Sequence, residues 1–449
     1  MSEVSSTPSP SSPAARRPQP LGRDFSLLWG ASGSANLADG LVRVVLPLIA
    51  VELTRSPALI AGIAVTTTLA WLVVGLPAGA LGDRLDRRII ALTIAVLRTV
   101  LLGTVALLLF TDHLTIGMLF AAAFLLGVGE AFFDTSTPAM VPSVVPQEEL
   151  SRAHGRRHAA SMAGDELVGP AAGGVLFGLS KAAPLLVSTV CHALSALTLW
   201  RLRIGSGRPS EPEGERTALL TEIRQGLILL VRNRRVFVVA LWGGLVNFAG
   251  SLTFAVLALY LVAPGPVGLD TWGFGVLMAS LGVGGLVGAS VAGRLAASVG
   301  ELRLLTLSCA TMAVDSAVLA ITTQVWAIAA GLVVGSAAAA VFGVMAITAL
   351  QRATPDSHLS RVSAGNQLVM MAGTALGGAV AGVLGEVTED LRVGFATAAV
   401  LLVSLTLMRT AFPVHPHGRG AEAHEPDSAG PPVDPSPRAR GRGDSGGLR

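Results

Sequence analysis

Long apolar runs restrict what this chain can fold into more than any other feature. The runs are about 20 residues each, the length at which a helix crosses the hydrocarbon core of a bilayer. The sequence is 51% hydrophobic and only 14% charged, whereas soluble domains carry about 25% charged residues. We therefore predict an all-α membrane protein with twelve transmembrane helices. They fall near residues 25–51, 57–81, 89–111, 115–140, 157–178, 184–203, 235–262, 272–296, 303–322, 325–349, 362–385 and 393–412.

The second half of the chain repeats short stretches of the first half. Pro146–Arg152 and Pro355–Arg361 both begin with Pro and end with Leu-Ser-Arg, and Met-Ala-Gly follows in the same register at Met162–Gly164 and Met371–Gly373. The other matched pairs are Gly169 with Gly378, Gly173 with Gly382, and Asn36–Asp39 with Asn247–Gly250. Because transporters are commonly built from related halves around a central site, we predict two pseudo-symmetric six-helix halves.

Arginines are concentrated in alternate loops between the predicted spans. Positively charged loops stay in the cytoplasm, so we predict a multi-pass protein of the cytoplasmic membrane with both termini cytoplasmic. The predicted organisation is a disordered tail at 1–23, helical halves at 24–203 and 235–412, a cytoplasmic linker at 204–234, and a disordered tail at 413–449. Within the linker, Leu219–Val231 fits either an interfacial helix or a soluble connection.

Composition excludes several kinds of function. The formal net charge is only +3, so no nucleic-acid surface is indicated. The two cysteines, Cys191 and Cys309, stand alone in apolar runs and are expected to be buried hydrophobic residues. We find no nucleophile–base set, metal-ligand spacing or nucleotide-binding loop. We therefore expect neither an enzyme nor a metal- or cofactor-binding protein, and we expect a monomer in the lipid bilayer.

Ionisable residues within the predicted spans are concentrated in the first half. Each Asp or Arg near the bilayer centre costs roughly 2.5–3.5 kcal/mol, and such residues persist where they pair, line a hydrated cavity or carry ions. The first half contains Asp39, Arg43, Arg98, Glu130, Asp134, Asp165, Glu166 and His192. The second half contains essentially one, Asp315. Since the related half does without these groups, we infer that coupling chemistry is concentrated in the first half.

Four of these residues are our candidates for proton coupling, namely Asp39, Arg98, Glu130 and Asp134. Asp39 and Arg43 are four residues apart on one helix, so they fit either a mutually neutralising pair or a proton site at Asp39. Glu130 and Asp134 are also four residues apart, and two carboxylates on one helix face repel each other. Arg98 is the predicted basic partner of these two acids.

The remaining ionisable residues carry less information. Asp165 and Glu166 point about 100° apart on a helix, so at most one of them faces a cavity. His192 fits a hydrogen-bonded structural histidine better than a proton shuttle. Asp315 stands alone, and the sequence offers no partner for it.

Gly79–Arg88 forms a charged segment between the second and third predicted spans. It resembles the signature G-x-L-x-D-R-x-G-R-R of the major facilitator superfamily, with Asp86 in place of the usual Gly. The resemblance implies a cytoplasmic gating loop in which Asp83 steadies one end-state by contact with the start of the eleventh helix. The gating-loop residues are Gly79, Asp83, Arg84, Arg87 and Arg88.

A Gly-Pro motif lies in the fifth predicted span. Pro170 removes a backbone donor and kinks a helix, while glycines allow tight packing between helices. The predicted hinge residues are Gly164, Gly169, Pro170, Gly173 and Gly174. The segment is similar to the fifth-helix motif associated with antiport in exporters of the same superfamily, although the first family glycine is displaced by one position.

Three segments, Gly127–Asp134, Val141–Arg152 and Gly169–Pro170, together resemble the macrolide-efflux-like branch of drug:proton antiporters. The similarity spans the twelve predicted helices and is best in the N-terminal half. Ala123 replaces the arginine that other drug antiporters carry in the fourth helix. If protons are coupled, another group must do that work, and Glu130 with Arg98 is our candidate.

The resemblance and the buried acids together predict a secondary active transporter. It would export an amphipathic small molecule, such as a drug or antibiotic, against proton entry, with the two halves rocking around a central cavity. Alternatives with the same fold are a siderophore or lysophospholipid carrier, or a uniporter. An alternative of another class is a non-transporting membrane scaffold or sensor, which has no need of buried acids.

Overall fold

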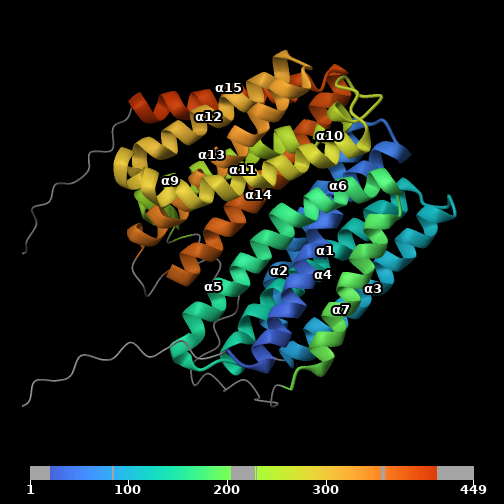
Figure 1. The fold of residues 1–449 in the computed structure, drawn as a ribbon. Coiled ribbons are helices and arrows are strands. Elements are labelled where there is room, and N and C mark those ends of the chain that lie inside the picture. The colour runs from blue at the N-terminus through green and yellow to red at the C-terminus, as the bar shows by residue number, and fades with distance from the viewer. Residues whose placement is uncertain (1–20, 83–84, 204–227, 229, 355–358, 412–449) are drawn as a thin grey trace, which may run out of the picture.

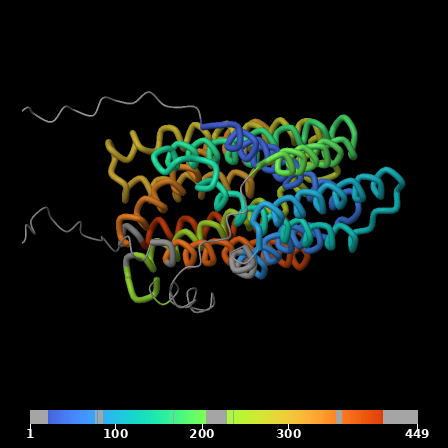
Figure 2. The backbone as a smooth tube through the Cα atoms, turned by 90° about the horizontal axis from the view of Figure 1, so that it is seen from below, coloured from blue at the N-terminus to red at the C-terminus, as the bar shows by residue number. Residues whose placement is uncertain are grey.

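The computed structural model describes residues 21–82, 85–203, 228, 230–354 and 359–411. Helices dominate the described chain (Figure 1), and Figure 2 shows many of them running side by side along one general direction. The earlier helices are α1 (Arg23–Leu53), α2 (Pro57–Gly82), α3 (Arg87–Phe110), α4 (Ile116–Ala139), α5 (Leu150–Ser161), a π-helical turn (Met162–Val168), α6 (Gly169–Leu179) and α7 (Ala183–Arg201). The later helices are α9 (Arg234–Phe254), α10 (Leu257–Leu261), α11 (Thr271–Val299), α12 (Glu301–Ile321), α13 (Val325–Ala353), α14 (Leu359–Thr388) and α15 (Arg392–Ala411).

Within the described residues, 10 helices are long and apolar enough to cross a membrane. Arg392–Met408, within α15, is a shorter apolar helix, and α5, the π-helical turn and α6 follow one another without a break. The predicted all-α architecture is confirmed, whereas the count of twelve spans stays a prediction. The predicted tails and the linker helix at Leu219–Val231 lie almost entirely outside the described residues.

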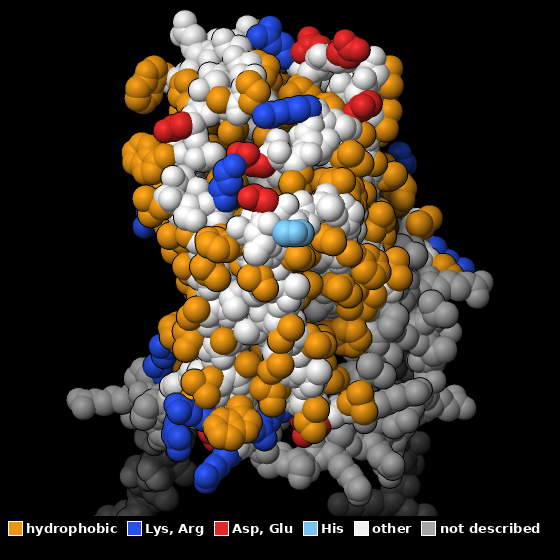
Figure 3. Space-filling model, turned by 90° about the vertical axis from the view of Figure 1, so that its right-hand side faces the viewer, with side chains coloured by type: hydrophobic (Ala, Val, Ile, Leu, Met, Phe, Trp, Pro, Cys, Tyr) orange, Lys and Arg blue, Asp and Glu red, His pale blue; other side chains and the backbone are white. Residues whose placement is uncertain are grey.

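The outer surface of the helices is largely apolar. Trp326, Phe110 and Ile321 are 87%, 80% and 78% exposed. On the face shown in Figure 3, charged side chains occupy the upper part and the lower end, and a band of hydrophobic or uncharged surface lies between them. Extended apolar surface of this kind marks contact with lipid or another apolar partner.

Polar side chains fix where several helices begin. The carboxylate of Asp86 accepts a hydrogen bond from the backbone N–H of Arg88 at 2.8 Å, and that of Asp270 accepts one from Gly273 at 2.8 Å. The first N–H groups of a helix have no partner within the helix, so these caps stabilise the starts of α3 and α11.

The helices pack mainly against others from the same part of the chain. In the earlier part, α1 packs against α6 and α7, α2 against α4, and α3 against α4 and α7; in the later part, α9 packs against α14, α11 against α13, and α12 against α13 and α15. The two parts meet where α2 contacts α14 and where α6 contacts α11. At the first contact the Ser56 hydroxyl donates to the Glu386 carboxylate at 2.6 Å. At the second, the backbones of Gly174 and Gly275 approach so closely that neither position has room for a Cβ.

Candidate functional site

A buried ion pair joins α1 to α3. Arg98 donates two hydrogen bonds to the carboxylate of Asp39, one of them from Nη1 to Oδ2 at 3.2 Å. The two side chains are only 4% and 10% exposed, respectively. Two parallel bonds fix both the separation and the orientation of the groups. The sequence offered Arg98 as the partner of the acids of α4, whereas the structure gives its hydrogen bonds to Asp39.

Gly129 of α4 makes room for this pair. A Cβ at Gly129 would lie 2.9 Å from Cδ of Arg98 and 3.1 Å from its Cγ, so a larger residue would push the arginine side chain away. The repeat-related residue is Ala338. We did not assign this role to Gly129 from the sequence. An arginine in one span and a glycine in the next are the pattern that could have indicated it.

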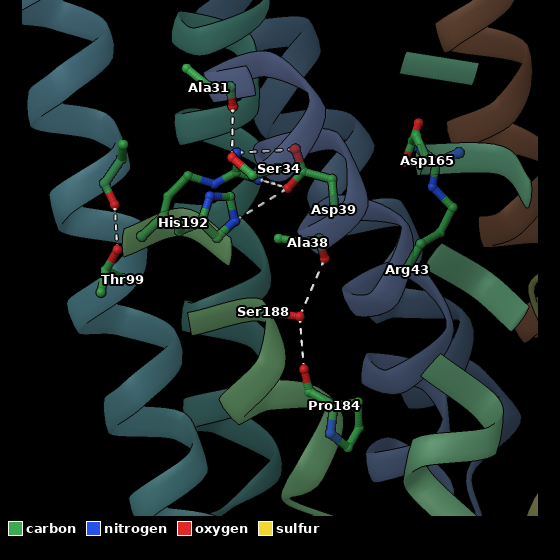
Figure 4. Close-up of polar contacts among 12 residues, drawn as sticks. Ala31, Ser34, Ala38, Asp39, Arg43, Thr99, Asp165, Pro184, Ser188 and His192 are labelled. Carbon is green, nitrogen blue, oxygen red and sulfur yellow. Dashed lines mark hydrogen bonds and ion pairs between the residues drawn. The ribbon is translucent and has the colours of Figure 1, made fainter. Parts of the chain in front are cut away.

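His192 of α7 lies beside the ion pair (Figure 4). Its Nε2 is 3.6 Å from Oδ1 of Asp39, which is too long for a hydrogen bond. The residue is 0% exposed, and neither ring nitrogen has a hydrogen-bond partner among the described protein groups. The geometry therefore shows no hydrogen bond of the length expected for a structural histidine, but it places the imidazole close enough to Asp39 to form an ion pair when it is protonated.

Glu130 and Asp134 continue the charged group along α4. Glu130 is half-buried and experiences the charges of Asp39 and Arg98. Asp134 is exposed, and the charges that act on it belong to Glu130, to residues of α1, α3 and the π-helical turn, and to Arg157 of α5. The two acids of α4 therefore belong to one charged group with Asp39 and Arg98.

A second ion pair links α1 to the π-helical turn. Nη2 of Arg43 donates to Oδ2 of Asp165 at 2.7 Å, and the side chains are 53% and 21% exposed. Figure 4 shows this pair on the other side of α1 from His192. Asp39 and Arg43 therefore find partners on different elements, although only four residues separate them. Of the two neighbouring acids in the turn, Asp165 reaches α1, and the side chain of Glu166 lies outside the described part of the chain.

The predicted distortion at Pro170 takes the form of the π-helical turn. The turn ends at Val168, and the N–H of Gly169 bonds to the carbonyl of Gly164, five residues back. Proline has no N–H, and its ring clashes with the carbonyl one turn earlier, so the wider turn relieves the conflict. Single π-helical turns occur frequently at functional sites, and sequence reasoning did not identify this one.

The glycines around Pro170 face two different helices. Gly164, Gly169 and Gly173 face α1, where a Cβ at Gly173 would lie 3.0 Å from the carbonyl oxygen of Leu41. Gly174 faces α11 instead. The motif thus packs one helix closely against two neighbours, and its role as a hinge stays a prediction.

Part of the predicted gating loop, Asp83 and Arg84, lies outside the described residues. Gly79 belongs to the last turn of α2. The contact that the family resemblance assigns to Asp83 therefore stays a prediction.

The other two gating-loop residues bind the ends of neighbouring helices. Arg87 donates to the carbonyl of Ala139 at 3.1 Å, at the end of α4. Arg88 donates to the carbonyls of Leu199 and Trp200 at 2.9 and 2.7 Å, near the end of α7. Cations are favoured at helix C-termini because the last carbonyls lack partners within the helix. These bonds place the start of α3 at the same level as the ends of α4 and α7.

The charged residues around Asp39 can form ion pairs and exchange protons. No cluster of three or more His, Cys, Asp or Glu residues suited to a metal ion occurs in the described ranges. Cys191 and Cys309 are free and buried. A carboxylate that exchanges a buried arginine for a proton changes the charge of the site, and such a change can bias helix packing.

A family model described as transmembrane secretion effector, MFS_3, matches residues 18–435 of the chain. Two curated relatives match over most of their length. The uncharacterized MFS-type transporter y4rN of Sinorhizobium fredii is 27% identical over 397 residues, which are 87% of this chain and 94% of the relative. The enterobactin exporter EntS of Escherichia coli O1:K1 is 28% identical over 392 residues, which are 81% of this chain and 86% of the exporter.

The fold is similar to that of a solved transporter. The crystal structure of the nucleoside transporter NupG superposes with a TM-score of 0.71 and 13% sequence identity, over 87% of this chain and 99% of NupG. At that identity the likeness shows the fold alone. The resemblance to the major facilitator superfamily is confirmed, and the assignment to a macrolide-efflux-like branch stays a prediction.

Proposed function

We propose that this chain, which belongs to the transmembrane secretion effector family of the major facilitator superfamily, exports an amphipathic small molecule in exchange for protons. The membrane potential can drive this exchange, because a proton crossing 100 mV releases about 2.3 kcal/mol. That energy supports roughly fifty-fold accumulation for each proton.

The buried Asp39–Arg98 pair is the observation that carries the proposal. Side-chain exposure rises from 0% at His192 through 10% at Asp39 to 53% at Arg43, and we propose that protons reach Asp39 from the side of α1 that carries Arg43. A proton that reaches Asp39 would cancel its attraction for Arg98. The arginine would then be a buried charge without its partner, which is costly enough to favour a different helix arrangement.

Alternating access supplies the second part of the proposal. We propose twelve spans in two six-helix halves with both termini cytoplasmic, and rocking of residues 24–203 against 235–412. The contacts of α2 with α14 and of α6 with α11 involve the start of α2, the end of α14, the end of α6 and the start of α11. All four lie at the end that this topology assigns to the outside. The described contacts thus favour a state closed on the outside.

A siderophore is the second candidate for the cargo. The relative EntS, named as an enterobactin exporter, covers most of this chain, and this observation favours the siderophore alternative over a lysophospholipid. Proton antiport and the site residues are the same in both proposals. The cargo therefore has to be identified by direct measurement.

Everted membrane vesicles test the proposal. The measurement is the uptake of ethidium, other labelled amphipathic drugs and enterobactin, with and without a protonophore. We expect at least one compound to accumulate only with the gradient intact, and Asp39→Asn and Glu130→Gln to reduce its accumulation to the protonophore level. Glu148→Gln, at an exposed acid outside the helices with membrane length, is the matched control and should transport normally.

Three other outcomes would change the conclusion. Flux that continues in the same direction with the gradient collapsed indicates a uniporter. Gradient-driven flux that neither variant reduces removes Asp39 and Glu130 from the coupling site. Absence of flux for every compound contradicts export of drugs and of enterobactin, and favours a non-transporting scaffold or sensor.

A further inference from the structure

Three buried serines join Arg98 and His192 among α1, α3, α4 and α7 as polar side chains whose hydrogen-bonding atoms are not all paired. These residues are between 0% and 3% exposed, and each has at least one polar side-chain atom without a hydrogen-bond partner among the described protein groups. The atoms are the hydroxyls of Ser32, Ser136 and Ser195, Nε of Arg98, and both ring nitrogens of His192. An unpaired buried polar group costs about 1–3 kcal/mol. Such groups are normally satisfied by protein or by ordered water.

Helix geometry places the serines on the faces that carry the ion pair. Residues three, four or seven apart lie on one face of a helix. Ser32 therefore shares a face with Asp39, Ser195 with His192, and Ser136 with Gly129, which abuts Arg98. The contacts of Asp39 with Arg98 and with His192, and of Gly129 with Arg98, bring these faces together.

The three serines are displaced toward the same end of the helices. That end holds the starts of α1 and α3 and the ends of α4 and α7, as the bonds from Arg87 and Arg88 show. An apolar cluster lies around and beyond the serines, and it includes Ala31 and Phe133 as well as Phe25, Met140 and Leu202. Water among the serines would therefore have apolar neighbours and would be bound instead of exchanging freely.

We propose that α1, α3, α4 and α7 enclose a chamber of ordered water that receives protons from Asp39 through His192. Buried waters typically make about three hydrogen bonds to otherwise unsatisfied groups, and the serine hydroxyls, the arginine and the imidazole supply these partners. Asp39 gives its proton to Nε2 of His192, and Nδ1 releases its own proton to a water molecule of the chamber, which becomes a hydronium ion and passes the proton on toward the cytoplasmic end. The imidazole ends neutral, and one proton has moved.

The electrostatic surroundings of His192 come from few groups. The helices packed against α7 are α1, α3 and α6. The first brings Asp39 and the second brings Arg98, while α6 contains no titratable residue. His192 thus faces one acid and one base that are already bonded to each other, so it is the group free to exchange a proton with water.

Radiolytic hydroxyl-radical footprinting of the purified full-length protein tests the chamber without any substrate. Radicals form at bound water, so we expect His192 to be oxidised although it is 0% exposed. Cys309, which is also 0% exposed and lies in α12, should be protected, even though a thiol is the more reactive group. Oxidation of His192 no faster than that of Cys309 would overturn the proposal.

A matched pair of variants tests the relay. Ser195 and Ser188 are both 0% exposed on α7, but the Ser188 hydroxyl already donates to the carbonyl of Pro184 at 2.8 Å. We expect Ser195→Ala to decrease the oxidation of His192, to slow proton-driven ethidium uptake by about tenfold and to shift its pH profile. Ser188→Ala should leave all three unchanged, and equal effects of both variants would contradict the relay.

The relay, unlike the chamber, rests on the proposed function. If the wild-type protein shows no gradient-driven uptake, proton antiport fails while footprinting still decides whether water is bound. If uptake is normal and His192 is protected from radicals, the chamber fails while antiport stands.

Discussion

The α1 region and the repeat-related α9 region make the same helix contacts with different chemistry. Arg43 of α1 forms an ion pair with Asp165 at 2.7 Å. The counterpart of Asp165, Thr374, hydrogen-bonds instead to Oδ1 of Asn247 on α9 at 3.4 Å, and the counterpart of Arg43 is Phe254. Asp39, which binds Arg98, corresponds to Gly250. The later region is therefore built with neutral groups at these positions, which supports our proposal that the charges of the earlier region take part in coupling.

Space does not explain why the later region lacks acids. A Cβ at Gly250 or at Gly343, the counterparts of Asp39 and Asp134, would meet no atom within 4 Å. These glycines leave room that side chains could fill. Packing therefore does not exclude acidic side chains from these two positions of the later region.

The same comparison explains the π-helical turn. α14 runs as one helix from Leu359 to Thr388, and its residue corresponding to Pro170 is Ala379. The earlier counterpart is divided by a turn immediately before the proline. One residue that lacks an N–H therefore accounts for the local difference.

The largest effect is expected from removing the acid of the buried ion pair. Asp39→Asn leaves Arg98 buried with no matching charge, which should lower the free energy of unfolding by about 3–5 kcal/mol. Denaturant titration in mixed micelles measures this, and Gly250→Asn is the matched change in the later region. The double variant Asp39→Asn/Arg98→Gln should recover part of the loss. A loss after Gly250→Asn as large as after Asp39→Asn would break the comparison.

Exchanging proline and alanine between the two regions should have the next largest effect. Ala379→Pro inserts a proline within α14 and should cost about 3 kcal/mol or more. Pro170→Ala should cost far less, because it allows regular bonding across residues 162–168. Hydrogen–deuterium exchange should show greater protection of that segment in Pro170→Ala. Unchanged exchange there would mean that packing on α1, and not the proline, holds the π-helical turn.

Adding one methyl group beside Arg98 should have a smaller effect. Gly129→Ala forces the arginine stem to move, and overpacking of this kind costs about 1–3 kcal/mol. Gly343→Ala adds the same group where nothing lies within 4 Å, so it should be neutral or stabilise by up to about 1 kcal/mol. Thermal unfolding of both variants measures the contrast. Equal destabilisation by the two variants would show that the Arg98 side chain readily adopts another conformation.

The smallest effect on stability is expected at the exposed ion pair. Asp165→Asn should change the free energy of unfolding by less than about 1 kcal/mol, because Arg43 is 53% exposed and screened by water. Gradient-driven uptake should nevertheless fall if the pair takes part in coupling. Thr374→Ala serves as the repeat-related control and should transport normally. Normal transport by Asp165→Asn would confine coupling to the Asp39–Arg98 pair and the acids of α4.

Much of the fold could be predicted from the sequence because lipid leaves few choices. Backbone groups in a bilayer must bond within their own helix or barrel, so apolar runs of sufficient length identify helices directly. The predicted spans near 89–111, 115–140 and 325–349 agree closely with α3, α4 and α13. The sequence also indicated which region holds the buried charges, because the internal repeat supplied its own comparison.

The partners of those charges could not be predicted in the same way. Arg43 is four residues from Asp39, yet Asp39 binds Arg98 and Arg43 binds Asp165. Sequence spacing measures proximity on one helix, whereas a buried pair depends on how neighbouring helices are rotated. The same limit applies to Gly129, whose function is visible only once α3 and α4 lie together.

By itself, therefore, the sequence determined that this protein lies in a membrane, where its helices are, its superfamily, and the concentration of ionisable residues in the earlier region. These properties follow from hydropathy, length and local motifs, which act along the chain. Only the tertiary structure decided that Asp39 pairs with Arg98, that His192 is buried beside them without a hydrogen bond, and that Pro170 follows a π-helical turn. These features depend on contacts between helices that are distant in sequence. The rotation of each helix and its position along the bundle determine which of several possible partners a side chain meets, and the sequence does not specify either.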